Sequence, residues 1–219
     1  MKNFLNKKLL FIKVLRIKTK SNEKIFTEIY KKQSWGGTSK SGPGSDLRET
    51  QKVREYLPKL LEKYVISSIL DIPCGDFNWL KEINLDSVSY IGGDIVDDLI
   101  QNNSKLYATK NKKFIKMDII NDHLPQMDLV LCRDALFHFS YSDIFKSIKN
   151  IGKSKSKYLL SSSYLLSTTN QDIVTGGWTR LNLLNKPFNF PKPLEIIHEG
   201  DFGEEKLDKS LLLWKISDL

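Results

Sequence analysis

The sequence predicts a doubly wound α/β domain built on a seven-stranded sheet, with an antiparallel pair of strands at its C-terminal end. Short β-branched apolar runs alternate with helix-like segments, which is typical of βαβ units and of a parallel sheet covered on both faces. Two further apolar runs near the C-terminus are only about a dozen residues apart, too close for a helical crossover, so they should pair antiparallel at the sheet edge. At 219 residues and 40% hydrophobic, the chain can bury one core.

Each expected strand is a short apolar run bounded by turn residues. The five strands expected in the parallel part are 65–71, 90–95, 113–119, 127–134 and 157–164. The segments with helical spacing between them are 47–64, 77–83, 97–108 and 141–152. The expected C-terminal pair is 194–199 and 210–216.

The helix at 47–64 should begin after a Gly/Ser-rich loop at 34–46, with Ser45 or Asp46 as its N-cap, and Pro58 should kink it. Its apolar face is expected to consist of Val53, Leu57, Leu60, Leu61 and Tyr64. The apolar face of the helix at 141–152 is expected to consist of Ile144, Phe145 and Ile148.

Charge is concentrated at the N-terminus. The net charge is +8, but the first twenty residues hold seven Lys or Arg and no acid, which leaves 27 basic and 26 acidic residues elsewhere. The body is therefore nearly neutral, and we expect no nucleic-acid partner. Residues 1–33 are interpreted as a basic extension, a solvated tail or strand-like docking arm. It lacks the single apolar face of an interfacial helix, and no apolar run is long enough for stable membrane insertion.

Cysteine and histidine usage argues against a metal centre. Cys74 and Cys132 lie far apart in no metal-binding spacing, which favours unpaired thiols in a reducing compartment, and we expect a cytoplasmic protein. The three histidines, His123, His138 and His198, form no cluster of ligands either. No metal is expected.

Acidic residues stand at the ends of successive predicted strands. Asp71 ends the first, Asp94 the second and Asp118 the third, and Arg133 and Asp134 end the fourth. Ligands of open α/β sheets bind outside the carboxyl ends of the strands, and unpaired buried carboxylates are costly, so these groups together predict a polar ligand. Asp94 follows Asp71 by 23 residues, close to the interval at which a second-strand acid meets the ribose of an adenosine cofactor. A single acid of this kind would more often be a helix cap.

The motifs "LDIPCGDF", "IGGDI", "MDI" and "DLVLCRD" resemble, in order and spacing, those of class I S-adenosylmethionine-dependent methyltransferases, whose Rossmann-like sheet ends in an antiparallel hairpin. More narrowly, "SGPGS", "DIPCGDFNW", "LCRDALFHFS", "NKPFNFPKP" and "SLLLWKISDL" resemble small methyltransferase-like proteins associated with glycans. The resemblance covers residues 34–219, which we take as the methyltransferase domain. It implies S-adenosylmethionine as the cofactor.

By this resemblance, Asp71 and Gly75 approach the methionine part of the cofactor, Asp94 its ribose and Asp118 its adenine, with Ile95 and Ile119 on either side of the ring. The first loop departs from the family's Gly-x-Gly-x-Gly pattern, because it has Pro73, Gly75 and Phe77. S-adenosylmethionine has no phosphate for such a loop to bind, so one glycine can suffice. Phe77 is expected to begin the next helix and pack beneath the loop.

Methyl transfer to a hydroxyl needs alignment and a base that removes the proton. The segment "CRDALFHF" offers His138 as the base, Asp134 as its alternative or orienter, and Arg133 to hold an anionic group. Each catalytic role has a structural alternative. His138 could pack at the start of a helix, and Asp134 could simply pair with Arg133.

Residues 165–193 form a long irregular insertion, of the kind that provides lids and substrate loops. At and within it, the residues Tyr164, Trp178, Arg180 and Asn182 suit a sugar or another polyhydroxyl ligand, although a loop packing on its own aromatics is an equal alternative. Trp35 is a further candidate, for closing the cofactor cleft.

The leading hypothesis is an O-methyltransferase acting on a hydroxyl of a glycan or small metabolite. A non-catalytic methyltransferase-like binding protein stays open because loop glycines are missing. A nucleotide-cofactor Rossmann enzyme would need a Gly-x-Gly-x-x-Gly loop, which the chain lacks. The sequence does not identify the acceptor or the oligomeric state.

Overall fold

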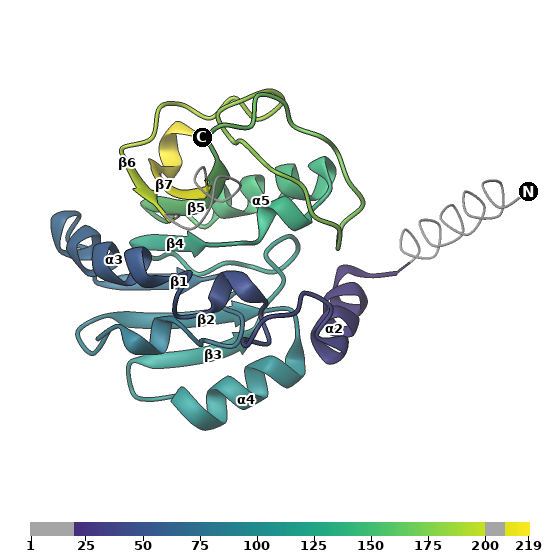
Figure 1. Ribbon diagram of the computed structural model, residues 1–219. Coiled ribbons are helices and arrows are strands. Elements are labelled where there is room, and N and C mark those ends of the chain that lie inside the picture. Colours follow the sequence, from purple (N-terminus) through teal and green to yellow (C-terminus); the bar gives the residue numbers. More distant parts are fainter. Residues whose placement is uncertain (1–19, 200–208) are drawn as a thin grey trace, which may run out of the picture.

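Seven strands form one sheet in the order β3-β2-β1-β4-β5-β7-β6 (Figure 1). The computed structural model describes residues 20–199 and 209–219, so the interpretation of the basic arm concerns residues outside this range, apart from 20–33. The strands are β1 Ser68–Asp71, β2 Ser89–Asp94, β3 Lys112–Lys116, β4 Leu129–Cys132, β5 Tyr158–Tyr164, β6 Glu195–His198 and β7 Lys209–Lys215. Strands β1 to β5 are parallel, and β7 runs antiparallel to both β5 and β6. The predicted doubly wound sheet with its C-terminal antiparallel strands is confirmed.

The sheet order reverses at β1, which has β2 on one side and β4 on the other. In a doubly wound sheet the connections leave such a point in opposite directions, and a crevice opens at the carboxyl ends of the strands. The α-helices are α2 Asn22–Lys32, α3 Gln51–Lys63, α4 Asp97–Tyr107 and α5 Tyr141–Lys153. Figure 1 shows α2 beyond the carboxyl ends of the parallel strands, next to this crevice.

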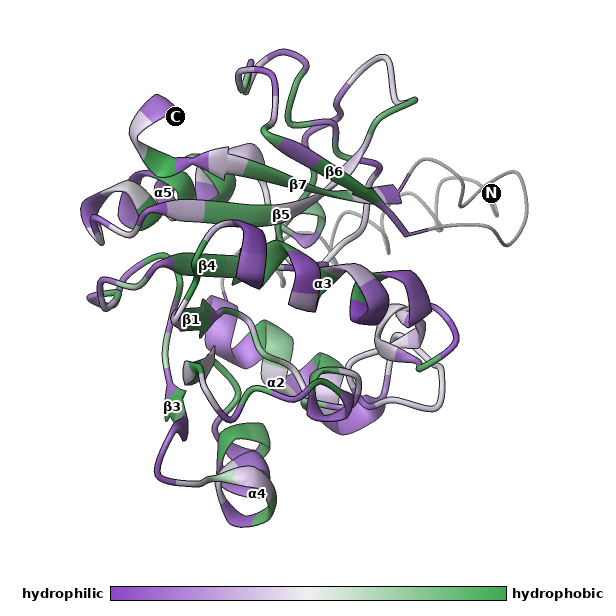
Figure 2. Ribbon diagram, turned by 90° about the vertical axis from the view of Figure 1, so that its left-hand side faces the viewer, coloured by the Kyte–Doolittle hydropathy of each residue, from purple (hydrophilic) through white to green (hydrophobic). Residues whose placement is uncertain are grey.

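Alternate residues along the central strands enter two separate cores, as the pleat of a strand requires. Ile69 of β1 and Leu129 of β4 pack on one face with α3 and α4. Their neighbours Leu70 and Val130 pack on the other face with α5. That second core also contains Leu181, Leu183, Phe188 and Phe190 of the insertion. Much of the insertion therefore covers one face of the sheet, as a helix would. The central strands that it helps to cover are strongly hydrophobic (Figure 2).

The predicted helix at 77–83 is wrong: only a 3-10 helix, Leu80–Glu82, forms there. Phe77 has a φ of 57°, in the left-handed region, and so cannot begin a right-handed helix. Its buried ring contacts Tyr90 and Phe114 at centroid distances of 5.2 and 5.1 Å. This aromatic cluster holds Phe77 beneath the loop, as predicted, while the backbone turns differently.

Helix α3 begins later than predicted, with Thr50 as its N-cap. Asp46 lies too early in the chain to cap it, and one of its carboxylate oxygens accepts hydrogen bonds from the Thr38 hydroxyl and the Ser39 backbone N–H within the preceding loop. The helix continues through Pro58, which is exposed. The predicted apolar face is otherwise confirmed within the helix, where the buried residues are Val53, Leu57, Leu60 and Leu61.

The apolar face of α5 is shifted from the predicted one. Ile144 and Ile151 are fully buried, with Ser147 between them, whereas Phe145 is 46% exposed. The Phe145 ring instead contacts Phe188 of the insertion at 5.2 Å. In residues 20–199 and 209–219, no helix has the length and apolar character needed to cross a membrane.

Candidate active site

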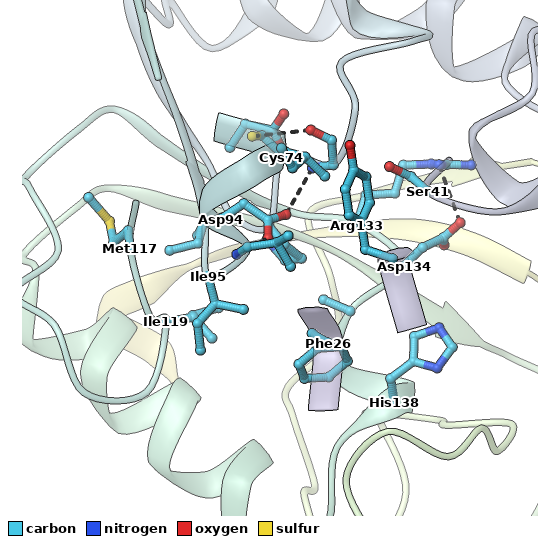
Figure 3. A pocket seen from close by; sticks show the side chains of 18 of the residues that line it. Phe26, Ser41, Cys74, Asp94, Ile95, Met117, Ile119, Arg133, Asp134 and His138 are labelled. Carbon is cyan, nitrogen blue, oxygen red and sulfur yellow. Dashed lines mark hydrogen bonds and ion pairs between the residues drawn. The ribbon is translucent and has the colours of Figure 1, made fainter. Parts of the chain in front are cut away.

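Two adjoining cavities open at the carboxyl ends of the strands. The strand-end cavity lies between β1, β2, β3 and β4 and the helix α2 (Figure 3). The loop cavity lies next to it, between the 34–46 loop, the insertion and the start of β7. Four residues line both cavities: Trp35, Ser41, Asp134 and His138. We call these four the junction.

Asp71 and Asp94 place two buried carboxyl groups in the strand-end cavity. The Tyr90 hydroxyl donates to Asp71 over 2.7 Å, and the backbone N–H groups of Val96 and Gly75 donate to Asp94 over 3.0 and 3.2 Å. Burial raises the pKa of Asp71 to about 7 and that of Asp94 to about 6, even though these hydrogen bonds act in the opposite direction. A positively charged or hydroxyl-bearing ligand that enters the cavity would therefore stabilise the ionised form of both carboxyl groups.

An apolar slot lies along the same cavity. Ile95, Met117 and Ile119 line it, and Ile119 is only 5% exposed. Asp118 lines the same cavity, and its carboxylate accepts from the Ile120 backbone N–H over 2.9 Å and from the Asn121 amide over 2.7 Å. These bonds fix the Asp118 side chain, and each carboxylate oxygen keeps a second lone pair for a ligand amino group.

Helix α2 provides the roof of the strand-end cavity, through Phe26 and Tyr30. The Phe26 ring lies 5.6 Å from that of Phe139, and Figure 3 shows it among Ile119 and His138. Exposed ion pairs join α2 to the body, including Glu23 with Lys116 at the end of β3, 2.6 Å apart. Residues 22–32 belong to the expected basic extension, and their contribution to the site is not predicted by the sequence.

The 34–46 loop is tied to the loop that follows β1. The Ser39 hydroxyl and the Lys40 backbone N–H donate to the Asp76 carboxylate over 2.8 and 2.9 Å, and the Asp76 N–H donates to the Ser41 hydroxyl over 2.7 Å. Gly75 has a φ of 56°, and a Cβ there would lie 2.4 Å from the Ser41 oxygen. Gly75 is therefore needed both for its backbone conformation and for the close approach of Ser41. The Ile72–Pro73 peptide in this loop is cis.

Arg133 belongs to a buried ion-pair network. Its Nε and Nη2 donate to the two carboxylate oxygens of Glu199 over 2.7 and 3.2 Å, and its guanidinium lies 5.3 Å from the Trp79 ring. Lys209 bridges Glu199 and Asp134 over 2.8 and 2.7 Å. Protein carboxylates thus already neutralise Arg133. Arg133 also lines the strand-end cavity, and its role in holding an anionic ligand group stays a prediction.

Asp134 is held in the same network. The Ser162 hydroxyl donates to it over 2.9 Å, and Arg133 lies 3.3 Å from its other oxygen. Although burial alone would raise it, the charges of Arg133 and Lys209 lower the pKa of Asp134 to about 2. A carboxylate this acidic is a weak base near neutral pH. The predicted pairing with Arg133 is present.

His138 ends the 3-10 helix Leu136–His138, and its imidazole contributes to the junction. Its Nδ1 lies 2.7 Å from the Gly177 backbone carbonyl oxygen. A carbonyl oxygen can only accept, so Nδ1 carries the proton and Nε2 of the neutral ring keeps a lone pair. Burial lowers the pKa of His138, against the opposing effects of that carbonyl and of Asp134. The neutral form with a basic Nε2 is favoured near pH 7.

The loop cavity has aromatic walls and a charged floor. Tyr164 and Trp178 form part of its wall, with their rings 6.0 Å apart and nearly perpendicular. Arg180 also lines it, and Glu199 and Lys209 lie at its base. Three of the four predicted acceptor residues are therefore brought together. Asn182 lines neither cavity: its buried amide donates to the Leu165 and Ser167 carbonyls and holds the insertion in shape.

Both thiols are buried and free. Cys74 lines the strand-end cavity beside Asp94, and Cys132 ends β4. Burial raises the pKa of each, so neither is a thiolate nucleophile at neutral pH. Among the residues that the structure describes, no cluster of three or more His, Cys, Asp or Glu could hold a metal ion.

The fold is that of solved methyltransferases. The N-methyltransferase NodS from Bradyrhizobium japonicum WM9, solved with S-adenosyl-L-homocysteine, superposes with a TM-score of 0.65 at 12% identity, over 89% of this chain and 98% of that one. Magnesium protoporphyrin IX methyltransferase from Synechocystis PCC 6803, with bound S-adenosylmethionine, gives 0.58 at 11% identity, over 90% and 98%. Human N-acetylserotonin methyltransferase, in complex with the same cofactor, gives 0.59 at 12%, over 92% of this chain and 61% of that one.

No protein-family model and no curated protein sequence matches this chain. The structural similarity shows the class I methyltransferase fold, and these three structures contain S-adenosylmethionine or its demethylated product. Their names cover different acceptors, one of them methylated on nitrogen, so the fold leaves the acceptor open.

Proposed function

We propose that this chain is an S-adenosylmethionine-dependent methyltransferase that O-methylates a hydroxyl group of a glycan or small metabolite. The observation that carries the proposal is the junction, where a histidine with a basic Nε2 stands between a cavity suited to adenosine and a cavity suited to an acceptor. Two buried thiols agree with a reducing compartment, and we keep the cytoplasm as the proposed location.

The residues of the strand-end cavity fit S-adenosylmethionine chemically. Asp94 would accept from the ribose hydroxyls, Asp118 from the adenine amino group, and Ile95 and Ile119 would enclose the adenine ring. Asp71 would face the positively charged methionine end, together with the Gly75 loop. The cofactor, when bound, supplies an activated methyl group on a sulfonium.

The protein's share of the reaction is alignment and proton removal. The acceptor would lie in the loop cavity with one hydroxyl at the junction, and His138 Nε2 would take that hydroxyl's proton as the oxygen–methyl bond forms. The Gly177 carbonyl keeps Nδ1 protonated and so keeps Nε2 available. Asp134, too acidic to be the base, would stabilise the imidazolium through its charge.

The charged groups around the loop cavity support a neutral acceptor. Asp134, Glu199 and Lys209 line it, and Arg133, which lines the strand-end cavity, completes their ion-pair network. The other two charged residues of the lining, Glu49 and Arg180, are opposite in sign. Such a closed network offers hydrogen bonds to hydroxyl groups without a net charge for an acid or an amine. The Tyr164 and Trp178 rings offer the apolar surfaces on which sugar rings stack.

The test is transfer of a deuterated methyl group from S-adenosylmethionine to a panel of methyl glycosides, polyols and sugar acids, followed by mass spectrometry. We expect transfer to neutral hydroxyl compounds, and we expect His138→Ala to reduce turnover by ~10²- to 10⁴-fold, the usual contribution of a positioned base, while S-adenosylmethionine still binds. The exposed His123 provides the matched control, His123→Ala, which should retain activity.

Binding of the cofactor without transfer to any acceptor would favour the non-catalytic alternative. Full turnover by His138→Ala would eliminate His138 as the base.

A further inference from the structure

Trp35 contacts His138 from a distant part of the sequence. Their ring centroids are 5.0 Å apart and the planes are inclined by 30°, so the indole packs against the imidazole in a tilted arrangement. The turn of the 34–46 loop backs onto Trp35, because a Cβ on Gly42 would lie 3.0 Å from the Trp35 Cβ. The Phe26 ring lies 6.4 Å away. The indole is therefore held in place by its own loop and by the roof of the strand-end cavity.

The Gly177 carbonyl alone does not fix the imidazole. One hydrogen bond at Nδ1 selects the tautomer and prevents the ring from flipping, but it lets the ring plane tilt about the bond. The indole, packed against the imidazole at an inclination of 30°, restricts that tilt. Resting on the proposed function, we propose that Trp35 is a positioning residue for His138, which fixes the imidazole plane at the junction and shields it from water.

Few charged groups act on the pKa of His138 beside Trp35. The charges that act on His138 are Asp134, which follows β4, and Lys209, which begins β7, and they oppose each other. Burial is the main cause of the lowered His138 pKa, and the Trp35 ring is one of the groups packed against the imidazole. Removing the indole should admit water to this side of the ring and raise the His138 pKa, while both charges stay in place.

The experiment is an NMR pH titration of the three histidines in the full chain, without cofactor or acceptor. His138→Ala assigns the resonance, and the exposed His123 is the internal reference. In Trp35→Ala we expect the His138 pKa to rise toward the ordinary value of about 6.5. In Trp35→Phe, which keeps an aromatic face, we expect it to stay closer to the wild-type value. The acidic limb of the turnover profile should move in parallel.

An unchanged His138 titration in folded Trp35→Ala would overturn the proposal. If that variant does not fold, Trp35→Thr, which also removes most of the apolar volume beside the imidazole, replaces it under the same criterion. Because the titration needs no ligand, it is independent of the proposed function: failure of the wild type to bind S-adenosylmethionine would reject the methyltransferase and leave the titration result standing.

Discussion

The two cavities differ in how they are built. The strand-end cavity takes its polar groups from the ends of consecutive strands, with Asp71, Asp94 and Asp118 each at or just after the strand that positions it. The loop cavity takes its groups from segments far apart in the chain, including the 34–46 loop, Trp178 and Lys209. One cavity thus follows from the sheet, whereas the other depends on how loops pack over it. This difference suggests that the first binds the common cofactor and the second selects the acceptor.

The largest effect is expected at the strand-end cavity. Asp94→Ala should weaken S-adenosylmethionine binding by ~100-fold or more, because two hydrogen bonds to a charged group, each about 1.5–3 kcal/mol, are lost. Calorimetric titration measures this. The matched control is Asp97→Ala, an exposed acid in the first turn of α4 that does not line the cavity. Equal affinities for the two variants would contradict the assignment of Asp94 to the ribose.

Substitutions in helix α2, the roof of the strand-end cavity, should weaken cofactor binding less than substitution of Asp94. Phe26→Ala removes a half-buried ring from the strand-end cavity and should weaken S-adenosylmethionine binding by ~10-fold, from about 1.5 kcal/mol of lost apolar contact. The control is Phe145→Ala, a 46% exposed phenylalanine on α5 outside both cavities. If Phe26→Ala binds as tightly as the control, helix α2 only packs beside the site.

A substitution in the loop cavity should affect acceptor binding without affecting cofactor binding. Trp178 is 56% exposed and lines that cavity alone. Trp178→Ala should raise the KM for the acceptor by ~5- to 10-fold, about 1 kcal/mol of lost ring contact, and leave the dissociation constant for S-adenosylmethionine unchanged. A parallel loss of cofactor affinity would show that the cavities are not independent.

The pH dependence of cofactor binding is spread over several pH units and also belongs to the strand-end cavity. In the empty protein, Asp71 and Asp94 hold protons up to about pH 7 and 6. The cationic cofactor favours their ionised forms, so binding should release protons and strengthen as pH rises from 5 to 8, by at most ~10-fold per unit and group. Asp71→Asn should flatten the upper part of this profile. A binding constant independent of pH in the wild type would contradict it.

The same two groups affect the stability of the empty protein. Between about pH 4 and 7 the folded chain holds protons that the unfolded chain has released, so the free energy of unfolding should fall as pH rises through this window. Asp71→Asn, which can still accept from Tyr90, should reduce the slope in thermal denaturation at a series of pH values.

The sequence predicted the sheet and the strand-end carboxylates because both are local patterns. Asp94 lies where its strand ends, whatever the loops do. The pairing of Arg133 with Glu199 could not be predicted from the sequence, because it depends on where β6 ends in space. Nor did periodicity show that Phe77 would turn out of a helix, because the aromatic cluster around it is a tertiary contact. The Trp35 and His138 rings meet for the same reason.

The central claim is that the strand-end cavity binds S-adenosylmethionine. Calorimetric titration of the wild-type chain with S-adenosylmethionine, and separately with NAD, tests it most directly. We predict that S-adenosylmethionine binds and that NAD does not, because the loop after β1 lacks the glycines that a pyrophosphate requires. A folded protein that binds NAD, or that fails to bind S-adenosylmethionine, would contradict the account.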